Sequence, residues 1–169
     1  MTHSEDSTIR AEILDLGDPR ICAAQIVINA RASTIFQILV QPRLHCDMNG
    51  KTSVQGFIRG PERLTLGSRF TMAMRLGIPY RITNTVLEFT PDERIAWAHL
   101  LGNRWSYDLW PTGPCETRVR ETNDLAVAGW RGRLSPVARK PDGMRRAIAR
   151  SLVRLKAMAE SLESNAPRT

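Results

Sequence analysis

Apolar and polar residues alternate along most of the chain, in short segments that glycine and proline residues separate. In residues 67–76, for example, Phe70, Met72 and Met74 alternate with polar side chains. A period of two places successive side chains on opposite faces of a β-strand. Comparable segments occur at 20–29, 51–59, 80–89, 94–101, 104–110 and 115–122. The pattern therefore predicts an antiparallel sheet of about seven strands.

The segment 80–89 departs from strict alternation. Leu87 and Phe89 have the opposite parity to Asn84 and Val86. Either a β-bulge lies near 86–87, or the phase is wrong for half of this strand.

Two other segments show helical spacing. After Asn29, a predicted N-cap, residues 31–40 place Ile35, Phe36, Leu39 and Val40 at helical spacing, and Pro42 ends this helix. Residues 43–48 are expected to add a short further turn. Residues 141–163 carry one apolar stripe, which consists of Met144, Ile148, Leu152, Leu155, Ala159 and Leu162. The segment 124–140 is rich in glycine and is expected to be a loop, either a lid or a fixed wall.

This order of elements predicts an α+β fold, in which a curved antiparallel sheet wraps around a long C-terminal helix, with one or two short helices after the first strand. The apolar face of the sheet needs a cover, and 141–163 is the only predicted element long enough. A curved sheet closed over one helix often leaves a cavity. We expect one domain at 19–163, between flexible tails at 1–18 and 164–169.

The net charge of the 169 residues is +7, and the whole excess lies after residue 129, where ten basic residues face three acidic ones. A basic stripe is typical of a polyanion-binding surface, but a solvated helix face with a loop is the favoured explanation. Only Trp130 supplies an aromatic side chain there, so no nucleic-acid partner is expected. The chain has no apolar stretch of roughly 18 residues and no apolar leader. We expect a cytoplasmic protein without integral membrane association.

Cysteine and histidine residues are few and widely spaced. Cys22, Cys46 and Cys115 form no paired motif, so neither a zinc site nor a disulfide framework is predicted. Only Cys46, beside His45, has neighbours that suit a nucleophile, and a small core residue is the alternative. The glycine-rich and serine motifs of nucleotide binding and of hydrolases are missing. The sequence predicts no metal and no cofactor.

Four stretches carry a resemblance to a known family: IVINARASTIFQILV at 26–40, PRLHCDMNG at 42–50, the segment 60–97, and AIARSLVRLKAMAESL at 147–162. Over residues 20–163 the chain resembles the START-related helix-grip superfamily (SRPBCC), in its polyketide cyclase/dehydrase and lipid-transport branch. The resemblance implies a helix-grip fold with one internal cavity, which the superfamily uses for lipid carriage, cyclisation, dehydration, hydrolysis or hormone sensing. The chain departs from the family at Ala30, where proline is frequent, and at His45 and Met48, where an aromatic residue is frequent.

The side chains predicted to face this cavity mix apolar bodies with a few polar tips. Methionine adapts to irregular ligands, and tryptophan offers an N–H donor. The predicted ligand-binding residues are Phe70, Met72, Met74, Asn84, Val86, Trp97, Trp105, Val119, Met144, Ile148 and Leu152.

Three further residues are candidates for acid–base chemistry. His99 could act as a general base, Glu121 would have a raised pKa if buried without a partner, and Tyr107 could donate to a ligand carbonyl. Each has a structural alternative. His99 could be a core histidine, Glu121 could pair with Arg118, Arg120 or a loop arginine, and Tyr107 could place its hydroxyl at the surface.

These features favour a protein that binds a small hydrophobic or amphipathic molecule of lipid or polyketide type. An enzyme of the polyketide cyclase/aromatase or dehydratase type, with His99, Glu121 and Tyr107 as its acid–base groups, is the alternative. A lesser alternative is attachment to an anionic membrane or nucleic acid through the basic C-terminal segment. The sequence leaves the ligand open, as well as the choice between monomer and homodimer.

Overall fold

The computed structural model describes residues 10–51, 53–99, 102–130 and 141–165, without the side chains of Leu76 and His99. In this part of the chain, eight strands form an antiparallel sheet in the order β1-β2-β8-β7-β6-β5-β4-β3. The strands are β1 (Glu12–Leu14), β2 (Ile21–Ile28), β3 (Val54–Arg59), β4 (Arg69–Leu76), β5 (Ile78–Thr90), β6 (Arg94–His99), β7 (Arg104–Gly113) and β8 (Glu116–Asp124).

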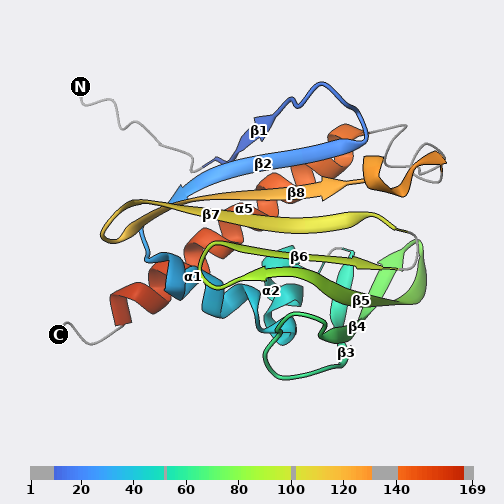
Figure 1. Cartoon of the computed structure of the whole chain (residues 1–169), viewed down its shortest axis with the longest axis horizontal. Coiled ribbons are helices and arrows are strands. Elements are labelled where there is room, and N and C mark those ends of the chain that lie inside the picture. The colour runs from blue at the N-terminus through green and yellow to red at the C-terminus, as the bar shows by residue number, and fades with distance from the viewer. Residues whose placement is uncertain (1–9, 52, 100–101, 131–140, 166–169) are drawn as a thin grey trace, which may run out of the picture.

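Helices cover one face of this sheet. They are α1 (Ala32–Leu39), α2 (His45–Asn49) and α5 (Pro141–Asn165), with the short 3-10 turn η1 (Pro42–Leu44) between α1 and α2. A second 3-10 turn, η2 (Ala126–Ala128), follows β8. Figure 1 shows α5 running diagonally behind β2, β8 and β7, with α1 and α2 beside it. The structure confirms the predicted α+β architecture of an antiparallel sheet and a long C-terminal helix.

The sheet has one more strand than the seven expected. Glu12–Leu14, which lie inside the predicted N-terminal tail, pair with Ala23–Gln25 of β2. Their side chains are largely exposed, so the sequence shows little of the alternation that marks the longer strands. β1 is therefore a short edge strand that pairs with the middle of β2.

A bulge explains the change of parity in β5. The register between β5 and β6 shifts between Val86 and Glu88, and Leu87 falls in the shift. Leu87 is exposed, while Phe89 returns to the interior and packs edge-on against Phe36 at 5.4 Å between ring centroids. One extra residue therefore restores the inward face of the strand.

The predicted cap of the first helix is wrong. α1 begins after Arg31, which makes no side-chain capping bond. The backbone N–H of Asn29 donates instead to Oε1 of Glu160 in α5, at 2.8 Å. A contact with a distant helix thus fixes Asn29 outside the first turn of α1.

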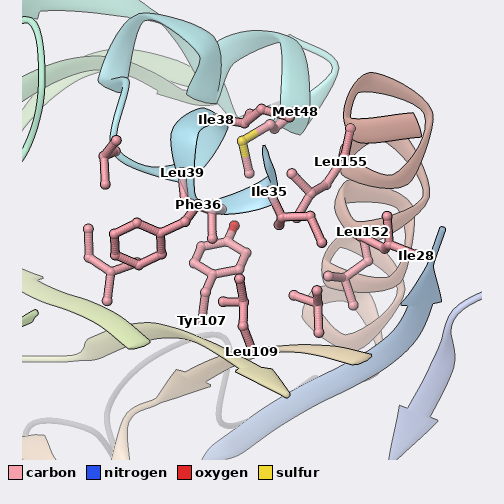
Figure 2. Close-up of a cluster of buried hydrophobic side chains, with 14 of the residues drawn as sticks. Ile28, Ile35, Phe36, Ile38, Leu39, Met48, Tyr107, Leu109, Leu152 and Leu155 are labelled. Carbon is pink, nitrogen blue, oxygen red and sulfur yellow. The ribbon is translucent and has the colours of Figure 1, made fainter. Parts of the chain in front are cut away.

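The core lies between the sheet and the helices. Ile148, Leu152 and Leu155 of α5 are fully buried, and they meet Ile28 of β2 and Ile35 of α1. Figure 2 shows Ile28, Ile35, Leu152 and Leu155 converging from three elements, with Tyr107 rising from β7 toward α1. The predicted helix 141–163 therefore has the predicted covering role. Most of the predicted lid, 131–140, lies outside the described residues.

Candidate functional site

A buried carboxyl group stands in this core. Along β8, Thr117, Val119, Glu121 and Asn123 alternate with more exposed residues, so all four point inward. Glu121 is only 1% exposed. A charged side chain is almost never this deeply buried without a partner, which makes the surroundings of Glu121 the first place to look for function.

One oxygen of Glu121 receives two hydrogen bonds from β7. The Tyr107 hydroxyl donates to Oε1 at 2.8 Å, and Trp105 Nε1 donates to the same atom at 3.0 Å. The register explains this, because Tyr107 is directly opposite Glu121 and Trp105 is the next inward residue on β7. The other oxygen, Oε2, is buried and has no hydrogen-bond partner among the residues described.

Burial raises the pKa of Glu121 to about 7, against the opposing influence of the neighbouring Tyr107, Trp105 and Ser151. The pKa of Tyr107 is raised well above its ordinary value, by burial and then by the neighbouring Glu121. Near neutral pH the carboxyl therefore exists in both protonation states, while the phenol keeps its proton. This is the behaviour expected of a proton donor or acceptor in a site.

Two alternatives that the sequence left open, an arginine partner on β8 for Glu121 and a surface hydroxyl for Tyr107, are wrong. Glu121 does not pair with Arg118 or Arg120, because both arginines alternate to the outer face, where Arg120 lies over the ring of Trp110. The hydroxyl of Tyr107 is not at the surface, since this residue is 3% exposed.

An aromatic cluster continues from Tyr107 into the core. Trp97 lies 5.8 Å from Tyr107 and 5.6 Å from Phe70, measured between ring centroids. The imidazole of His45 stacks on Trp97, with 5.2 Å between the ring centroids and an interplanar angle of 16°. The cluster joins β4, β6 and β7 to the short helix α2.

His45 is a buried residue that the sequence did not single out for this role. Its Nε2 is 2.9 Å from the carbonyl oxygen of Leu39, so Nε2 carries the hydrogen and donates it. Burial lowers the pKa of His45 to about 4, and the ring is neutral at physiological pH. The resemblance gave one indication of this role. The family often has an aromatic residue near this position, and the imidazole of His45 stacks as an aromatic ring would.

The predicted ligand-binding residues gather around this cluster. Phe70, Met72, Val86, Trp97, Val119, Ile148 and Leu152 belong to one buried core, and Met74, Trp105 and Met144 are half-buried against it. Asn84 is buried on β5, opposite Phe70 of β4. The backbone of His99 on β6 lies opposite Asn84 of β5, and the structure does not describe the side chain of His99. Of the three acid–base candidates, Glu121 and Tyr107 are brought together.

Cys46 does not have the environment of a nucleophile. Its Sγ faces the carbonyl oxygen of Val54 at 3.5 Å. Burial, and then the charge of Asp47, raise the pKa of the thiol, which disfavours the reactive thiolate. Within the described ranges, His, Cys, Asp and Glu side chains form no group of three that could hold a metal ion.

Several basic residues of α5 have structural contacts. Lys156 donates to the carbonyl oxygen of Val27 at 2.9 Å, and Arg145 lies 3.6 Å from Asp142. Arg154 packs over Gly50, the left-handed residue that ends α2, where a β-carbon would collide with the guanidinium. These contacts account for part of the basic stripe without a polyanion.

None of the described helices is both long enough and apolar enough to span a membrane.

Sequence comparison identifies relatives but no named activity. No protein-family model matches the chain. An uncharacterized protein of Mycobacterium tuberculosis, Rv0088, is 38% identical over 118 residues, which make up 69% of this chain and 52% of that protein. The chain spans about half the length of the curated relatives it matches.

Solved structures give the fold. A protein of Rhodobacter sphaeroides has a TM-score of 0.66 at 15% identity, over 90% of this chain and 99% of that chain. An AHSA1-like protein of Aeromonas hydrophila has a TM-score of 0.58 at 17% identity, over 87% of this chain and 98% of that chain. Together with the sheet order and the covering helix, these similarities show the fold that the sequence predicted, a helix-grip fold with an antiparallel sheet and a long C-terminal helix over one face.

Proposed function

We propose that the chain binds a small hydrophobic or amphipathic molecule, of lipid or polyketide type, between the sheet and α5. The observation that carries the proposal is Oε2 of Glu121, a buried carboxyl oxygen without a hydrogen-bond partner in the described structure. Leaving such a group unsatisfied costs about 1–3 kcal/mol or more. A polar atom of a ligand placed against Oε2 would remove this cost.

The neighbours of Glu121 favour a ligand with an apolar body. Val119 precedes it on the inward face of β8, and Ile148 and Leu152 of α5 belong to the same buried core. Small-molecule sites are typically lined by apolar and aromatic side chains, with a few polar groups that fix orientation. Glu121, Tyr107 and Trp105 supply such polar groups.

The test compares two tryptophan substitutions on α5. Leu152→Trp adds volume at a fully buried position, and Leu162→Trp adds the same side chain at a position that is 51% exposed. Native mass spectrometry would detect a co-purified molecule, and the fluorescence of N-phenyl-1-naphthylamine would report uptake of a neutral apolar probe. We expect Leu152→Trp to lower occupancy by about tenfold or more, because the added ring competes for the same space, and Leu162→Trp to leave it unchanged.

Circular dichroism would confirm that both variants fold, and Ile148→Phe is a milder substitution on the same face of α5. If wild-type protein carries no molecule and takes up no apolar probe, the proposal is wrong.

An enzyme of the cyclase or dehydratase type is the second candidate. It is favoured by the hydrogen bond between Tyr107 and Glu121, whose pKa of about 7 suits proton transfer at neutral pH. Turnover of a bound carbonyl compound that is lost in Glu121→Gln, without a loss of affinity, would favour this candidate over simple binding.

A further inference from the structure

We infer that Glu121 recognises its ligand as a hydrogen-bond donor, giving a proton from Oε2 to a carbonyl oxygen, so that the ligand class is hydrophobic ketones, esters and related carbonyl compounds. The inference rests on the proposed function, since it assigns the polar end of the molecule proposed to bind there. It concerns recognition and involves no covalent step.

The position of the proton follows from the two hydrogen bonds on Oε1. The indole Nε1 of Trp105 can only donate, so Oε1 must be an acceptor. The Tyr107 hydroxyl, 2.8 Å from the same atom, donates as well. A carboxyl proton on Oε1 would face both donors, so the protonated group carries its hydrogen on Oε2. That hydrogen then has no acceptor among the described residues.

The groups around Glu121 favour this protonated form. β2 places Ala24 opposite Glu121, and β7 supplies the neutral donors Trp105 and Tyr107. From α5, the hydroxyl of Ser151 is the polar neighbour that influences the pKa of Glu121.

The nearby titratable and charged groups do not alter this picture. Cys22 of β2 has a thiol pKa raised by burial, so it stays neutral. His45, on the far side of Trp97, is neutral because its pKa is about 4. Arg145 of α5 pairs with Asp142 and is not among the groups that shift the pKa of Glu121. In the described structure, no positive charge holds the carboxyl in its ionised form, so burial favours the donor.

An amine ligand is the competing chemistry, because an ammonium group would require the ionised carboxylate. The two possibilities have opposite pH dependence. A ketone that accepts from protonated Oε2 loses affinity as the carboxyl ionises, whereas an ammonium ligand gains it.

The experiment measures displacement of N-phenyl-1-naphthylamine from the full chain by three ten-carbon probes at pH 5.5, 7.0 and 8.5. The probes are 2-decanone, decylamine and 1-decene, which share an apolar body and differ at one end. We expect 2-decanone to bind at least about tenfold more tightly at pH 5.5 than at pH 8.5, because the pKa of Glu121 lies between these values. The affinity for 1-decene should not change with pH.

Two substitutions of Glu121 separate its role from a structural one. Glu121→Gln keeps an N–H donor at every pH, so 2-decanone should retain its affinity and lose its pH dependence. Glu121→Leu removes the donor, so 2-decanone should bind no better than 1-decene. Both replacements are neutral and similar in size, and Glu116→Gln, an exposed position on the same strand, is the control.

The outcomes distinguish this inference from the proposed function. A preference for decylamine that grows above pH 7 would overturn the donor role, as would equal, pH-independent binding of 2-decanone and 1-decene. In both cases the proposed function would stand. If none of the probes, including N-phenyl-1-naphthylamine, binds, the proposed function fails as well.

Discussion

The proton on Glu121 is controlled by a few neighbouring atoms. Burial raises the pKa of this carboxyl, and the Tyr107 hydroxyl makes the largest opposing contribution, followed by Trp105 and Ser151. These neighbours stabilise the ionised form, Tyr107 and Trp105 through their hydrogen bonds to Oε1. The balance between burial and these bonds places the pKa of Glu121 near 7.

Tyr107→Phe should therefore raise the pKa of Glu121 further above 7, because burial remains and the largest opposing hydrogen bond is lost. Carbon-13 NMR of the glutamate side-chain carboxyl carbons would follow the titration directly. Tyr80→Phe changes a half-exposed tyrosine at the start of β5 and should leave the pKa unaltered. A pKa of Glu121 that stays at or below the wild-type value in Tyr107→Phe would contradict the hydrogen-bond geometry described here.

Sequence periodicity was sufficient to place Glu121 and Tyr107 on the inward face, because side chains in a strand alternate with a period of two. It could not show that Trp105 and Tyr107 share one oxygen of Glu121, since this depends on the register between β7 and β8. His45 could not be placed by periodicity either, because α2 has only five residues and its packing is decided by Trp97.

Among the elements, α5 does more than cover the sheet. Its last turns reach the start of α1, where Glu163 accepts hydrogen bonds from the Arg31 backbone N–H at 3.2 Å and from the Thr34 hydroxyl. The Arg31 guanidinium also pairs with Glu163, at 2.8 Å. A carboxylate near a helix N-terminus is favoured by the positive end of the helix dipole. This contact replaces the local cap that Asn29 was expected to provide. Because Glu163 is 132 residues from Arg31 and 129 from Thr34, local sequence patterns could not show it.

Glu163→Ala should lower the free energy of unfolding by about 1 kcal/mol, the typical effect of removing a helix cap. Alanine has the best helix propensity, so a loss cannot come from weakening α5 itself. Urea unfolding followed by circular dichroism would measure the change. Ser161→Ala, at an exposed position two residues earlier, is the matched control and should have little effect. Equal stabilities of the two variants would show that Glu163 does not hold α1.

Over the whole molecule, charge is separated between the two faces of the sheet. On the outer face, Arg94 pairs with both Glu88 and Asp108, and Arg104 pairs with Glu88. In the core between the inner face and the helices, burial shifts the pKa of Glu121 upward and that of His45 of α2 downward, so both groups favour their neutral forms. The alternation along the strands predicts this separation in general, but not which inward polar groups titrate.

The two inner groups have opposite effects on stability. Between pH 4.5 and 7, folded Glu121 keeps a proton that the unfolded chain releases, so the free energy of unfolding falls as pH rises. Between pH 4 and 6.5, the unfolded chain binds a proton on His45 that the folded ring excludes, so the free energy of unfolding rises with pH. Each slope approaches about 1.4 kcal/mol per pH unit, and the two cancel between pH 4.5 and 6.5.

Single substitutions should uncover each slope. In His45→Gln the free energy of unfolding should fall from pH 5 to 6.5, and in Glu121→Gln it should rise, while wild type changes less than either variant. Urea unfolding at half-unit steps of pH, followed by tryptophan fluorescence, would measure all three. The lowered pKa values of Glu88, Glu160 and Glu163 affect stability mainly below pH 4.5, outside this window. If both variants kept the wild-type profile, Glu121 and His45 could not be buried in the neutral forms that the interior favours.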